Sequence, residues 1–132
     1  MTDHASALVA AFVLPGQRER LLGLLATTRG RAKARRYLAH FQALDPRYAR
    51  QVPPGQQDPP TIRRLLEARG APPTCHVFSE DPELDGQELA LADALERIIG
   101  QGMGTLLSCV PRRLGYYEGE EPRERYILER AA

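Results

Sequence analysis

The sequence predicts an α/β fold in which residues 1–132 form a single domain. We expect a sandwich with a mixed, largely parallel central sheet of about five strands, four helices and a C-terminal antiparallel hairpin. The length of 132 residues fits one domain, and 42% hydrophobic with 27% charged residues is typical of a globular protein. Apolar runs of strand length alternate with segments of helical periodicity. Strands separated by helices usually run parallel, which gives the predicted direction of the sheet.

The first half of the chain is predicted to hold one strand and three helices. The apolar run ALVAAFVL, residues 7–14, ends at Pro15-Gly16 and indicates a buried strand. Leucines at helical spacing predict a helix from residue 17, and an apolar stripe predicts a second helix over residues 31–44. After the proline-rich loop 51–60, Asp58 and Gly70 have the positions of the N-cap and C-cap of a third helix.

The second half is predicted to alternate strands with one helix before it ends in the hairpin. Asp85 and Glu88 have capping-box spacing for a helix over residues 86–99. The predicted strands are Thr74–Phe78, Thr105–Val110, Leu114–Glu118 and Arg125–Glu129.

The glycine-rich stretch Gly100–Gly104, GQGMG, resembles a phosphate-binding loop in composition only. Such loops leave a strand and enter a helix, whose N-terminal N–H groups meet the anion. Here the predicted helix comes first and the strand follows. We therefore expect Gly100 to end the helix in a left-handed conformation.

Composition and charge argue against several functional classes. A net charge of +1 gives no general attraction to nucleic acid, and no apolar run approaches the roughly 18 residues of a membrane span. The N-terminus lacks a basic lead-in, so we expect no export signal and a cytoplasmic location. Arginine supplies 17 of the 18 basic residues, a ratio typical of codon bias, so a single arginine is weak evidence for a site.

The leading functional hypothesis rests on tyrosines near the C-terminus. Tyr116, Tyr117 and Tyr126 fall in the predicted hairpin, and aromatic residues are enriched at protein interfaces. An edge hairpin also offers unpaired backbone groups to another chain. We expect a non-catalytic interaction module that binds a protein partner or self-associates through this hairpin.

The alternative hypothesis is an enzyme that acts on a phosphorylated small molecule or on nucleic acid. Glu80 and Asp81 follow one predicted central strand, and Arg112 and Arg113 follow another. In a parallel sheet these groups would share one rim, with the carboxylates as base or Mg²⁺ ligands and the arginines as phosphate ligands. Mg²⁺ enters only under this alternative, and no other cofactor or metal is predicted.

Weaker anion-binding candidates lie in the first third of the chain. Gly16 and Arg18 occupy a predicted strand-to-helix turn, where backbone N–H groups can receive an anion. The basic segment 29–36 could contact nucleic-acid phosphates through a face that includes Lys33, Arg36 and His40, although the low net charge argues against it.

The two cysteines, Cys75 and Cys109, are too few for a disulfide scaffold and lack metal-site spacing. We expect two buried thiols, with a Cys109–His76 nucleophile pair as the alternative. Strand alternation places Cys75 and His76 on opposite faces.

Overall fold

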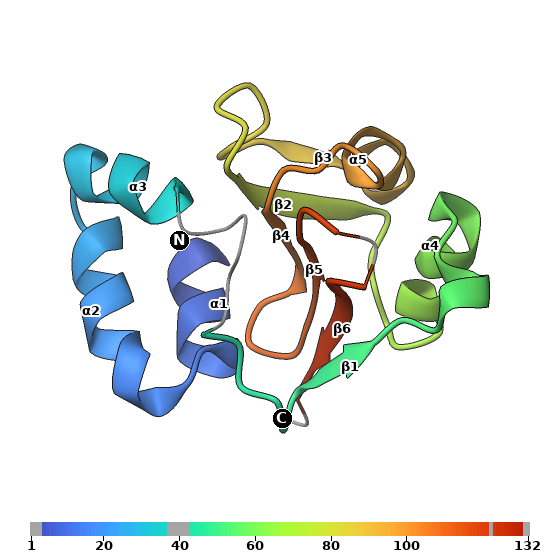
Figure 1. Cartoon of the computed structure of the whole chain (residues 1–132), viewed down its shortest axis with the longest axis horizontal. Helices are drawn as coiled ribbons and strands as arrows, with labels where there is room; N and C mark the ends of the chain where they lie inside the picture. Colours follow the sequence, from blue (N-terminus) through green and yellow to red (C-terminus); the bar gives the residue numbers. More distant parts are fainter. Residues whose placement is uncertain (1–3, 37–42, 122, 131–132) are drawn as a thin grey trace.

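The computed structural model describes residues 4–36, 43–121 and 123–130, which form one six-stranded sheet with helices on both faces (Figure 1). The strand order is β1-β6-β5-β4-β2-β3. The α-helices are α1 His4–Phe12, α2 Pro15–Leu25, α3 Thr28–Arg35, α4 Pro59–Glu67 and α5 Leu91–Ile98, with a short 3-10 helix η1 at Pro54–Gln56. The strands are β1 Ala49–Gln51, β2 Thr74–Ser79, β3 Glu88–Ala90, β4 Thr105–Val110, β5 Leu114–Glu118 and β6 Arg125–Glu129.

The predicted parallel sheet is wrong, because every pair of neighbouring strands is antiparallel. The prediction missed β3, whose residues were assigned to the start of a helix. This short strand reverses the chain beside β2 before α5 begins at Leu91. The chain then returns through α5 and enters β4 antiparallel to β2, with Val77 opposite Leu107. The described residues hold five α-helices where four were predicted.

The predicted strand at residues 7–14 is also wrong, since most of this run lies in α1. A continuous apolar run fits a buried helix as well as a buried strand. The run is rich in alanine, which has the highest helix propensity of the amino acids. α1 buries apolar residues around most of its circumference, including Leu8, Val9 and Phe12, as expected of a helix enclosed by other elements.

The sheet separates two apolar cores. Helices α4 and α5 cover one face, where Leu66 and Leu95 pack in the same cluster as Tyr116. Helix α1 covers the other face, where Phe12 packs in the same cluster as Tyr117. Figure 1 shows this three-layer order, with α1–α3 on the left of the sheet and α4 and α5 on the right.

Several local predictions are confirmed. The β4, β5 and β6 bounds agree with the prediction, and β2 is longer by one residue. Asp58 caps α4 by accepting a hydrogen bond from the Thr61 N–H at 3.1 Å. Gly100 follows α5 with φ of 86°, the left-handed conformation expected of it. The β5–β6 hairpin does not lie at the sheet edge, however, because β1 pairs with β6.

None of the helices in the described part of the chain has the length and apolar character needed to cross a membrane.

Candidate functional site

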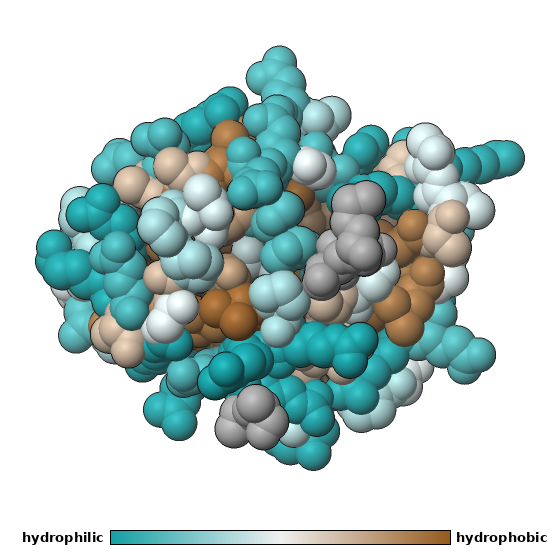
Figure 2. Space-filling view, turned by 180° about the vertical axis from the view of Figure 1, so that it is seen from behind, coloured by the Kyte–Doolittle hydropathy of each residue, from teal (hydrophilic) through white to brown (hydrophobic). Residues whose placement is uncertain are grey.

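An arginine-lined pocket of about 560 Å³ lies at the end of the sheet where β4 turns into β5. Its lining residues come from four separate segments of the chain: Arg47, Tyr48 and Arg50; Arg69 and Gly70; Val110, Arg113 and Leu114; and Glu129 and Arg130. In Figure 2 hydrophilic side chains cover the lower edge of the molecule, where Figure 1 places β1 and the end of β6. The lining contains five arginines and one glutamate, a formal excess of four positive charges: Arg47, Arg50, Arg69, Arg113 and Arg130 against Glu129.

Two of these arginines are held by carboxylates. Arg47 donates from Nε and Nη2 to the two carboxylate oxygens of Asp45, at 3.1 and 2.7 Å. Asp45 is only 2% exposed, and its hydrogen bonds with Arg47 lower the pKa of its carboxyl group. Arg69 donates to the Leu65 carbonyl at 2.9 Å and pairs with Glu129 at 3.4 Å. Both guanidinium groups therefore have carboxylate partners within the protein.

Arg130 is held by backbone and aromatic contacts. Its Nη1 donates to the Ala11 carbonyl at the end of α1, at 3.1 Å, and its backbone N–H donates to the Arg113 carbonyl at 2.9 Å. The guanidinium carbon lies 4.6 Å from the ring centroid of Tyr48, which the Arg47 guanidinium also approaches, at 5.2 Å. These cation–π contacts place two cations on one ring of the pocket wall.

The side chains of Arg50 and Arg113 form no hydrogen bond or ion pair with the residues that the structure describes. Both residues are exposed, Arg50 on β1 and Arg113 in the turn between β4 and β5. Arginine stays protonated at all physiological pH values. Like charges brought together repel one another, and an anion between them relieves that repulsion and gains charge-assisted hydrogen bonds.

The structure separates the residues of the enzyme hypothesis. Arg113 lines the pocket, whereas Arg112 is not among its lining residues and adopts a left-handed backbone with φ of 65°. Ser79, just before Glu80, pairs with Thr105 at the start of β4, and the arginines follow its end. Five residue steps of β4, roughly 17 Å, therefore separate the acidic turn from the two arginines. Figure 1 shows the loop after β2 at the top and the β4–β5 turn below, so the predicted common rim does not exist.

The acidic turn after β2 has local structural contacts. The Glu80 carboxylate accepts a hydrogen bond from the Gly104 N–H at 3.0 Å, and the Asp81 carboxylate accepts one from the Glu83 N–H at 2.9 Å. These bonds tie the end of β2 to the segment before β4. In the described residues, no group of three or more His, Cys, Asp or Glu side chains is placed to hold a metal ion.

Gly16 and Arg18 lie near the start of α2, but helix α1, not a strand, precedes them. Arg18 Nε donates to the Val13 carbonyl at 2.9 Å. The predicted strand-to-helix turn is therefore a helix-to-helix turn, and the Arg18 side chain bonds to the segment that joins α1 to α2.

The basic segment 29–36 falls mostly in α3 and pairs with the protein's own acidic turn. Arg31 and Arg35 contact one oxygen of Asp85, at 3.3 and 3.2 Å, and the Asp85 side chain is 5% exposed. Asp85 thus anchors α3 and does not cap a helix. His40 lies outside the described residues.

The three tyrosines of the interface hypothesis are largely inside the protein. Tyr116 and Tyr117 are 0% and 1% exposed and pack on opposite faces of the sheet. Tyr126 is partly buried, opposite Tyr117, with ring centroids 6.5 Å apart. Neither Tyr116 nor Tyr117 offers its side chain to a partner in this conformation.

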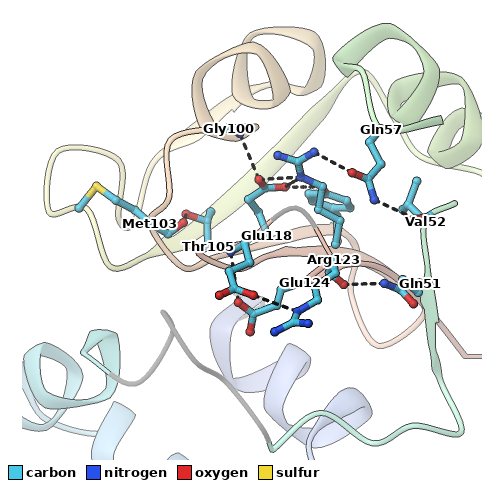
Figure 3. Close-up of polar contacts among 12 residues, drawn as sticks. Gln51, Val52, Gln57, Gly100, Met103, Thr105, Glu118, Arg123 and Glu124 are labelled. Atoms are coloured by element: carbon cyan, nitrogen blue, oxygen red, sulfur yellow. Dashed lines mark hydrogen bonds and ion pairs between the residues drawn. The ribbon is translucent and has the colours of Figure 1, made fainter. Parts of the chain in front are cut away.

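A buried polar network around Glu118 was not predicted (Figure 3). Glu118, 1% exposed, accepts hydrogen bonds from Arg125 Nε at 2.9 and 3.0 Å and from the Gly100 N–H at 3.1 Å. Tyr116 donates its hydroxyl to Glu118 at 2.6 Å, and Arg125 Nη1 donates to Gln57 at 3.0 Å. Burial, followed by the nearby Glu118 charge, raises the pKa of Tyr116. In the predicted hairpin Glu118 is opposite Arg125, and opposite charges at such cross-strand positions attract. This placement could have predicted the ion pair from the sequence.

Every charge in this network has a partner, so its role is structural. It joins the hairpin to the loop that contains Gln57 and to the end of α5.

The cysteines are free and buried, as expected. Burial raises the pKa of both thiols from 9.0 to about 12. Cys109 packs in the cluster on one face, whereas His76 points to the other, where its ring stacks on His4 with centroids 3.6 Å apart. The two faces prevent a Cys109–His76 pair.

Comparison with protein-family models, curated protein sequences and solved structures found no match to this chain.

Proposed function

We propose that this protein binds a phosphorylated small molecule in the arginine-lined pocket. The observation that carries the proposal is the convergence of five arginines from four segments on one cavity, of which Arg50 and Arg113 have no partner in the described residues. Codon bias raises the number of arginines but does not explain why they gather at one place in a chain whose net charge is only +1.

The pocket favours a small ligand over a nucleic-acid strand. Its volume of about 560 Å³ falls in the range typical of small-molecule sites. Phosphate suits the lining because a guanidinium group binds phosphate oxygens through two parallel hydrogen bonds. The pocket also has stronger support than docking through the hairpin, since Tyr116 and Tyr117 are buried.

Isothermal titration calorimetry with inorganic phosphate tests the proposal on the whole chain. Ionic strength is held constant with chloride so that general screening does not change. We expect saturable binding with a Kd of about 1 mM or lower. Arg113→Ala should weaken it by about tenfold, because a hydrogen bond to a charged group contributes about 1.5–3 kcal/mol.

The matched control is Arg112→Ala, which removes the neighbouring charge from the same turn but leaves the pocket lining intact. We expect it to retain binding within about twofold. Absence of saturable binding, or equal losses in both variants, would show that the pocket is not a phosphate site.

We also propose that the protein is located in the cytoplasm. This location is supported by two free cysteines, since thiols stay reduced in the cytosol.

A further inference from the structure

We infer that the pocket selects a ligand with two linked phosphoryl groups, a diphosphate, over one with a single phosphate. The inference rests on the proposed function and narrows its ligand class. It follows from the net charge of the pocket lining and from the positions of Arg50 and Arg113 in two different segments of the chain.

The charge balance favours more than one phosphoryl group. The lining carries an excess of four positive charges, and Asp45, which holds Arg47 from outside the lining, offsets one of them. About three positive charges thus remain. A phosphate monoester carries about −1.5 to −2 at pH 7, so one phosphate leaves the pocket positive. A second phosphoryl group brings the ligand charge close to that of the site.

The two free arginines approach the pocket from different segments, Arg50 from β1 and Arg113 from the turn between β4 and β5. Arg50 is opposite Ile127 on β6, and β6 in turn pairs with β5, which Arg113 directly precedes. Ile127 is in turn opposite Tyr116, three residues after Arg113. The Arg50 and Arg113 backbones are therefore separated by two strand spacings across the sheet, roughly 10 Å, and by three residue steps along it, again roughly 10 Å. Each guanidinium can engage one phosphoryl group through its own pair of hydrogen bonds. A diphosphate lying along the second half of β6, between the levels of Ile127 and Arg130, uses both.

The other arginines give the site its orientation. Arg47 and Arg130 are fixed at the Tyr48 ring, and Arg69 is fixed against Glu129. Because these side chains already have partners, they give a preorganised positive field without the loss of freedom on binding that Arg50 and Arg113 undergo. Arg50 and Arg113 are therefore the specificity-determining residues.

The test compares inorganic pyrophosphate with inorganic phosphate by calorimetry on the whole chain at constant ionic strength. We expect pyrophosphate to bind at least about tenfold tighter, since it adds a charge-assisted contact. Arg50→Ala and Arg113→Ala should each reduce that preference to about threefold or less, and Arg112→Ala should leave it unchanged. ADP compared with AMP then shows whether the preference extends to a nucleotide that carries the diphosphate.

The outcomes separate the two proposals. Equal, saturable binding of phosphate and pyrophosphate overturns the diphosphate inference and leaves the phosphate site standing. If neither anion binds, both proposals fail. A preference that survives both arginine substitutions contradicts the roles given to Arg50 and Arg113. Circular dichroism of each variant confirms that a loss of binding does not come from unfolding.

Discussion

At the scale of single residues, the meaning of an arginine depends on what holds its guanidinium group. Arg31 and Arg35 pair with Asp85, so the basic segment that the sequence offered for nucleic acid has a structural explanation. Arg50 and Arg113 have no such partner in the described residues. Sequence alone could not separate these cases, because the partners lie about 50 residues away or further in the chain.

The buried thiols give a prediction about pH. A thiol with a pKa of about 12 in the folded protein and 9.0 when unfolded stays protonated in the fold while the unfolded chain ionises. The folded state then binds more protons between these two values, so stability falls as pH rises above about 9. We expect the ionisation of Cys75 and of Cys109 in the unfolded chain each to lower the free energy of unfolding by about 1 kcal/mol at pH 10 relative to pH 7.

Urea unfolding in a reducing buffer, at pH values from 7 to 10, measures this loss. The control is the double variant Cys75→Ala and Cys109→Ala, which should lose less stability over the same range. The same pH dependence in wild type and variant would contradict the protonation state assigned to the thiols.

At the scale of elements, the sequence predicted the positions of helices and strands better than the relative direction of the strands. The hairpin strands, β2, β4 and the Asp58 cap followed from alternation and capping, which depend on neighbouring residues. The helix α1 and the strand β3 did not. An apolar run such as that of α1 is compatible with either a helix or a strand. The capping-box spacing of Asp85 and Glu88 predicted a helix start at the residues that form β3. Missing one short strand reversed the predicted direction of the sheet.

The Glu118 network shows what joins these elements. We predict that Glu118→Gln lowers the free energy of unfolding by about 3–5 kcal/mol, because it leaves the Arg125 charge buried without its counter-ion. The matched control is Glu121→Gln in the same hairpin. Glu121 pairs with Arg123, whose side chain is 79% exposed, and such surface pairs contribute about 1 kcal/mol or less. Similar small losses in both variants would refute a structural role for the network.

At the scale of the whole molecule, the candidate site exists only after folding. Arg50 and Arg113 are brought to one pocket by the β1-β6-β5 order, which the sequence did not predict because β1 has only three residues. The sequence did single out Arg113, from its place after a strand. The carboxylates chosen with it lie at the other end of β4, because the strands that carry them are antiparallel.

The most direct measurement is a nuclear magnetic resonance titration of the arginine Nε–Hε signals with inorganic phosphate at constant ionic strength. The central claim predicts saturable shifts for Arg50 and Arg113, with little change at Arg20, an exposed residue of α2 that does not line the pocket. Shifts of similar size at all three arginines, or none at Arg50 and Arg113, would contradict an anion site at the end of this sheet.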